Sequence, residues 1–273
     1  MISATTNPFC FAAAVGAGLA TAGVSLCLKA AERHECRPRA FGLAQLGIAT
    51  LLSLTVAVTQ GANWTGGWFW VLGLATGTLM YGAIPIMIAA NRLSPPSLVW
   101  AMANMGLLVP ILGSALFLYE PLQPLDAVVL ALFAGMLAAF HRGTRAAQDT
   151  RPGHRLRVIL LLAAVLAVNG ILMFGFKING RYFPEQVSGR LPVVMYGTAA
   201  LLALIQFRAW RELREIRTGE WRWGSAAGLA GGTSILLLLP TMKLPAGVVF
   251  PVIQGASPDR WRRIDRSRIP RTH

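Results

Sequence analysis

The chain has 273 residues, of which 55% are hydrophobic and 13% are charged. Its mean hydropathy of +0.54 is too high for the surface of a soluble protein of 29.3 kDa. Lys and Arg outnumber Asp and Glu by 25 to 11, which gives a net charge of +14. These charges lie between apolar runs, as the flanks of membrane helices do, rather than along one face that would bind nucleic acid. The composition therefore excludes a soluble globular protein and predicts an integral membrane protein.

The cysteines and histidines predict no disulfide, metal site or bound cofactor. Cys10, Cys27 and Cys36 are odd in number and lack CxxC spacing. The four histidines fall in expected loops or in the tail, outside the apolar runs. Residues 1–28 carry no charge, so the first run lacks the basic start of a secretory signal and is expected to remain as a helix.

Charge-free apolar runs give the expected helices in chain order. A helix that crosses the hydrocarbon core needs about 20 apolar residues, because every backbone polar group must be satisfied within it. Runs of this kind occupy residues 8–28, 41–59, 67–90, 97–118, 123–141, 157–176, 191–207 and 224–242. The sequence therefore predicts an all-α, polytopic transmembrane helix bundle of eight or nine spans.

The ninth span is uncertain because the composition changes abruptly near the end of the chain. The apolar run 244–258 is shorter than a crossing needs, and six of the last fourteen residues are Arg. Two interpretations stay open. Either a short ninth helix is followed by a basic tail, or the segment 258–273 results from a truncation or a shifted reading frame.

The distribution of Lys and Arg predicts the orientation, since cytoplasmic connectors carry an excess of them. With the N-terminus outside, the cytoplasmic connectors and the tail hold 21 of the basic residues. The outer connectors then hold four, namely Lys177, Arg181, Arg190 and Lys243. We therefore expect the N-terminus to lie outside.

Two parts of the chain resemble each other. The segment from Gly73 to Pro85 is identical to that from Gly228 to Pro240 at six of thirteen positions, 155 residues apart. Weaker matches at offsets of 148 and 150 residues align the first and fourth helices. Corresponding helices are five spans apart, and because five is odd the two halves would have opposite orientations in the membrane. The predicted organisation is two inverted five-helix repeats, residues 1–150 and an incomplete second repeat at 151–257.

The sequence resembles the drug/metabolite transporter superfamily, specifically its EamA-like permeases, over about residues 8–257. The best marks are Arg92-Leu93-Ser94-Pro95 leading to Glu120, and the run Leu244 to Pro251. The resemblance implies inverted repeats, a location in the inner membrane, and transport of a small organic metabolite or drug coupled to protons or to exchange. One departure is Pro121, which stands where the family tends to place a basic residue.

Polar residues near the span centres are the candidate substrate ligands, because an unpaired polar group in hydrocarbon is costly. Asn104, Asn169 and Gln254 fit this argument, and an interhelical hydrogen bond is the alternative role. Lys29 and Lys177 end equivalent spans and would neutralise an anionic substrate at opposite mouths, unless their ammonium groups extend to the interface.

Aromatic and acidic residues add further candidates. Tyr81, Trp100 and Phe250 would line an aromatic pocket for a planar or cationic solute, with packing as the alternative. Glu120 is the carboxylate that we nominate for proton coupling. Glycine pairs four residues apart, at Gly73 and at Gly228, are expected to pack helices closely.

These features predict a secondary transporter that moves a small organic solute by alternating access. No set of residues predicts an enzyme, because no nucleophile, base or metal cluster converges in the spans. The alternative is a non-transporting membrane scaffold or a partner subunit, or a truncated transporter without function. The expected partners are a small-molecule substrate, the lipid bilayer, and a second copy or another subunit.

Overall fold

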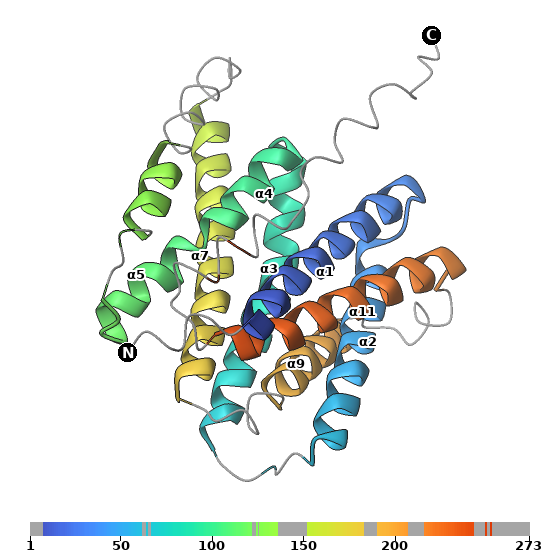
Figure 1. Cartoon of the computed structure of the whole chain (residues 1–273). Helices are drawn as coiled ribbons and strands as arrows, with labels where there is room; N and C mark the ends of the chain where they lie inside the picture. The colour runs from blue at the N-terminus through green and yellow to red at the C-terminus, as the bar shows by residue number, and fades with distance from the viewer. Residues whose placement is uncertain are drawn as a thin grey trace.

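The structure, a computed structural model, describes residues 8–61, 64, 67–121, 124, 126–135, 152–182, 190–206, 216–242, 249 and 252. These residues form helices and connectors without any strand (Figure 1). In chain order the helices are α1 (Pro8–Arg33), α2 (Pro38–Thr59), α3 (Trp68–Leu93), α4 (Pro96–Met105), α5 (Leu108–Phe117), α7 (Pro152–Tyr182), α9 (Arg190–Gln206) and α11 (Thr218–Thr241). The all-α class predicted from the sequence is confirmed for this part of the chain.

Six segments of the described residues are long and apolar enough to cross a membrane: Phe9–Ala31, Pro38–Thr59, Trp68–Leu93, Leu98–Phe117, Leu156–Tyr182 and Thr218–Thr241. Each matches one predicted run. The runs 123–141 and 191–207 instead correspond to shorter described helices, Asp126–Gly135 and Arg190–Gln206. Large apolar side chains such as Trp68, Leu116 and Ile205 are exposed on the outside of the bundle, as expected for helices that face lipid.

The predicted run 97–118 is broken into α4 and α5 instead of forming one straight helix. Pro110 has no amide hydrogen, so the carbonyl of Gly106 cannot accept the usual helical bond from it. That carbonyl accepts the tighter bond from the amide of Val109 at 3.0 Å. At the same point the chain crosses α7, and a Cβ atom on Gly106 would lie 2.8 Å from the amide nitrogen of Gly170. The break is therefore placed where two backbones approach closely.

The contacts between helices form a repeated pattern if α1 is matched with α7, α2 with α9, and α3 with α11. The helix α1 packs on α11 as α7 packs on α3, and α2 packs on α11 as α9 packs on α3. The contact between α2 and α9 is its own counterpart in this matching. Figure 1 shows α9 and α11 passing close to α2. This is the arrangement that two related halves would make about a pseudo-two-fold axis.

The glycine pairs of the matching segments lie at two of these contacts. A Cβ atom on Gly77 would lie 2.5 Å from the carbonyl oxygen of Met195, so α3 and α9 approach through this face. A Cβ atom on Gly228 would lie 2.5 Å from the carbonyl oxygen of Gln45, and the same holds for α11 and α2. The expected packing role of both pairs is confirmed by this geometry.

Several predicted features lie outside the described residues. They are Gln254, the tail 258–273, and all of the run 244–258 except Val249 and Val252. The C-terminal part of the run 123–141, beyond residue 135, is outside as well.

Candidate functional site

A cavity of about 620 Å³ lies between α2, α3 and α9. It extends from Arg92, near the C-terminal end of α3, to Tyr81, near the middle of that helix. Its opening is at the end of the bundle where α2 begins and where α3 and α9 end. The lining residues are Arg37, Pro38, Arg39, Ala40, Gly42, Leu43, Leu46, Tyr81, Ile84, Pro85, Ile88, Ala89, Arg92, Ala203 and Gln206. A volume of this size is typical of small-molecule sites.

The opening of the cavity is basic. Arg37, Arg39 and Arg92 line it, and no acidic side chain does so in the part of the chain that the structure describes. Arg39 and Arg92 are exposed, and within the described part of the chain neither has an ion-pair partner. They are the charged groups at this opening that are available to a solute.

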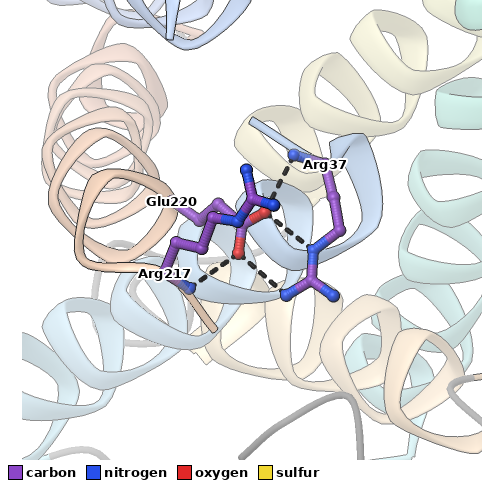
Figure 2. Close-up of polar contacts among 3 residues, drawn as sticks. All are labelled: Arg37, Arg217 and Glu220. Carbon is purple, nitrogen blue, oxygen red and sulfur yellow. Dashed lines mark hydrogen bonds and ion pairs between the residues drawn. The ribbon is translucent and has the colours of Figure 1, made fainter. Parts of the chain in front are cut away.

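Arg37 differs from these two because Glu220 neutralises it (Figure 2). The guanidinium of Arg37 donates from Nε to Oε1 of Glu220 at 2.8 Å and from Nη2 to Oε2 at 3.0 Å. The backbone amides of Arg37 and Arg217 donate to the same carboxylate at 3.0 and 2.9 Å. Glu220 is fully buried, so these four bonds replace its hydration. The pair fixes the start of α2 against the start of α11.

The described lining between Arg92 and Tyr81 is mostly apolar, and the contact of Tyr81 with Gln206, the last residue of α9, is exposed. Leu43 and Leu46 from α2 face Ile84 and Ile88 from α3 across the cavity. The hydroxyl of Tyr81 donates a hydrogen bond to Oε1 of Gln206 on α9.

A proline provides a further acceptor beside Tyr81. Pro85 lies inside α3 and has no amide hydrogen, so the Tyr81 carbonyl four residues earlier lacks its helical donor. A solute in the cavity would meet the phenol of Tyr81 and the side-chain amide of Gln206.

The opposite end of the bundle is closed by a buried ion pair. Nζ of Lys177, near the C-terminal end of α7, lies 2.9 Å from Oε1 of Glu120 and donates to the carbonyl oxygen of Met242 at 3.3 Å. Lys177 is 1% exposed and Glu120 is partly exposed. This contact joins α7 to the segment after α5 and to the end of α11.

Lys177 therefore does not extend to the interface, and it does not line the cavity. Lys29 is exposed near the end of α1 and also lies outside the cavity lining. Among the predicted substrate ligands that the structure describes, Tyr81 is the one that lines it.

The remaining predicted ligands lie around α4 and α7. The side-chain amide of Asn169 donates to the carbonyl oxygen of Ala103 at 2.5 Å, which is the interhelical hydrogen bond weighed as its alternative role. Asn104 and Trp100 are half-buried on α4 and do not line the cavity. The structure thus separates these three residues from Tyr81.

The residues that sequence reasoning missed are Arg39, Arg92 and Gln206 in the cavity, and the pair of Arg37 with Glu220. The arginines were counted only as flanking charge. Their predicted location on one side of the membrane was the available signal, because it brings separate connectors to the same end of the bundle. No sequence signal indicated that Gln206 would meet Tyr81.

One titratable group lies in the connector beside the cavity opening. Burial raises the pKa of the Cys36 thiol above its usual value, the nearby Glu220 carboxylate raises it further, and Arg217 opposes this effect. Within the described residues, no three His, Cys, Asp or Glu side chains gather where a metal ion would be held.

Comparisons with known proteins give a fold and no name. No protein family matches the sequence, and no curated protein matches it. Six chains of solved structures match. One of them, titled "Crystal structure of protein", has a TM-score of 0.59 at 19% sequence identity, over 94% of this chain and 98% of its own. At that identity the likeness shows a shared fold, and function has to be argued from the site.

Proposed function

We propose that this protein is an integral membrane secondary transporter of a small organic solute, of the kind that its resemblance to EamA-like permeases implies. The observation that carries the proposal is the cavity of about 620 Å³, which is open at one end of the bundle and reaches Tyr81 near the middle of α3. Substrate sites of secondary transporters lie near the bilayer midplane between two related halves. Here α2 and α3 come from one half and α9 from the other.

The two ends of the bundle differ in the way that alternating access requires. The end with Arg39 and Arg92 is open to the cavity, whereas the other end is tied by Lys177 and Glu120. A solute at Tyr81 would be released to the second side only after this ion pair opens. The matching contact patterns of the two proposed halves support such a transition. Related halves can exchange conformations, so that one end of the bundle opens as the other closes.

The proposal includes an orientation. Placing the N-terminus outside puts the cavity opening in the cytoplasm and the pair of Lys177 with Glu120 at the outer face of the inner membrane. The excess of Lys and Arg on the connectors at the open end supports this orientation.

A test uses purified protein in liposomes and accumulation of labelled solutes by counterflow. Pools of organic acids, amino acids, nucleosides and sugars are loaded inside, and tracer uptake is measured against empty liposomes. We expect one pool to support uptake and Ala89→Trp, which fills the cavity, to abolish it. Leu74→Trp is the matched control, because Leu74 lies on the same helix with its side chain exposed away from the cavity.

Uptake equal to that of empty liposomes for every pool would contradict the proposal. That outcome favours the scaffold or partner-subunit interpretation. Equal loss of uptake in both tryptophan variants would also contradict it, because the cavity would then not be the path.

A further inference from the structure

We infer that the cavity binds an organic anion, with the acidic group at Arg39 and Arg92 and an apolar body directed toward Tyr81. The inference rests on the proposed transport site and adds its substrate class. Carboxylates, sulfonates and phosphates share the required chemistry, because each accepts hydrogen bonds from two guanidinium groups.

The charge of the lining residues favours an anion. Three of the described lining residues are arginines, and Glu220 balances one of them, which leaves two positive charges at the opening. No Asp or Glu among the described lining residues offsets them. A cation entering here would be repelled at the opening, and an anion would be attracted.

The hydrogen bonds between Arg37 and Glu220 keep the Glu220 carboxylate from offsetting the charge of Arg39 and Arg92. The guanidinium of Arg37 is held by both oxygens of Glu220, so it cannot turn away without losing two charge-assisted hydrogen bonds. The backbone amides of Arg37 and Arg217 hold the same carboxylate independently of that side chain. The carboxylate of Glu220 is therefore kept out of the solute path. The first amide groups of α2, at Arg39 and Ala40, add partial positive charge at the same place.

The inner lining sets the rest of the ligand. Leu43, Leu46, Ile84 and Ile88 offer an apolar surface between the opening and Tyr81. A small inorganic anion would leave this surface in contact with water, whereas an aromatic or branched aliphatic body would cover it. The phenol of Tyr81, near the middle of α3, provides a polar contact for the far end of the solute.

The same chemistry is offered by an anionic lipid headgroup. The solute is favoured because Tyr81, near the middle of α3, and Gln206, at the end of α9, are polar groups of the described lining that acyl chains would desolvate. Removing polar groups from water without new partners is costly.

The test uses three naphthalene probes that differ in charge: the sulfonate, its neutral sulfonamide and the naphthylmethylammonium cation. Binding is measured as ligand-induced melting shifts and as dissociation constants on the full chain in zwitterionic lipid nanodiscs. We expect the sulfonate to bind at least about tenfold more tightly than the sulfonamide, and the ammonium compound not to bind. Because this comparison uses the wild-type chain, it does not depend on the folding of any variant.

Variants locate the charge. Arg39→Gln and Arg92→Gln are each expected to weaken sulfonate binding about tenfold or more and to leave sulfonamide binding unchanged. Arg157→Gln is the control, because Arg157 is an exposed arginine on α7 that is expected on the same side of the membrane and lies outside the cavity. An increase in ionic strength should weaken the binding of the sulfonate and leave the binding of the sulfonamide unchanged.

The inference would be overturned by equal affinity for the charged and neutral probes, by tighter binding of the cation, or by an equal loss in the Arg157→Gln control. Stabilisation by anionic phosphatidylglycerol that depends on Arg39 and Arg92, without competition by the sulfonate, would overturn it in favour of a lipid site. Sulfonate binding without counterflow would contradict the proposed transport while the inference stands. Transport of a solute without preference for anions would contradict the inference alone.

Discussion

Arg37 holds Glu220 with both ends of its guanidinium and with its own backbone amide, across 183 residues of sequence. Because Arg37 precedes α2 and Glu220 lies in the first turn of α11, this contact joins the starts of these two helices beside the cavity opening. It also keeps the only carboxylate bonded to a lining arginine, within the described residues, away from the solute.

Loss of the Glu220 charge is expected to destabilise the protein. Glu220→Gln removes charge-assisted bonds from a buried site and should lower the free energy of unfolding by about 1 to 3 kcal/mol, measured as a lower melting temperature in detergent. Glu35→Gln is the matched control, because Glu35 is exposed in the adjacent connector. Partial recovery in the charge-reversed double variant Arg37→Glu with Glu220→Arg would support the pairing. Identical melting of Glu220→Gln and wild type would contradict it.

Opening of the closed end is expected when Lys177 loses its charge. Lys177→Gln removes the ion pair with Glu120, so the end of α7 is no longer tied to the segment after α5. The reporter is Ser114→Cys in a chain without native cysteines, because Ser114 is buried on α5 near this end. We expect an impermeant maleimide to label the reporter several-fold faster with Lys177→Gln than without it. Arg181→Gln, an exposed change on the same helix, should leave the labelling rate unchanged.

Close packing of α3 on α9 predicts a contrast between two glycines on one helix. A Cβ atom at Gly77 would lie 2.5 Å from the Met195 carbonyl oxygen, so Gly77→Ala should destabilise the protein by about 1 to 3 kcal/mol. Gly82 has no neighbouring atom within 4 Å of the corresponding position. Gly82→Ala should therefore be neutral or stabilise the helix by up to about 1 kcal/mol. Melting temperatures of the two variants check this, and equal shifts would mean that α3 does not approach α9 at Gly77.

Cysteine labelling tests the orientation in the membrane. With Cys10 and Cys27 replaced by Ser, an impermeant maleimide is expected to label Cys36 in inside-out vesicles and not in intact cells. The rate should keep rising with pH above the range of an ordinary thiol, because the raised pKa of Cys36 keeps more of it protonated at neutral pH. Arg181→Cys in the cysteine-free chain should show the opposite pattern. Labelling of Cys36 in intact cells would show that the N-terminus has the opposite orientation to the one proposed.

The sequence by itself determined the helical class and the positions of the long helices. Apolar runs of about 20 residues are a local property, so α1, α2, α3, α7 and α11 could be located from composition alone. The close-packing role of Gly73 and Gly228 could also be inferred, since glycines four residues apart clear one helical face wherever the helix lies.

The tertiary structure decided which residues share a site. Asn104 and Asn169 were selected for their depth along a helix and Trp100 for its aromatic ring, but neither property specifies the direction in which a side chain points. The structure places them around α4 and α7, away from the cavity that Tyr81 lines. Conversely, Arg39 and Arg92 were interpreted only as charges that flank membrane helices. The sequence predicts the side of the membrane on which they lie, but not that they line the same cavity.

The same limit explains the two ion pairs. Glu220 meets Arg37 and Lys177 meets Glu120 only because helices distant in the sequence end at the same level of the bundle. A charge pattern records the cost of burying each group alone, whereas the pairing that removes this cost depends on how the helices pack. The sequence thus determined which polar and charged groups need partners in the membrane. The packing of α2, α3, α7 and α11 decided which partners they meet.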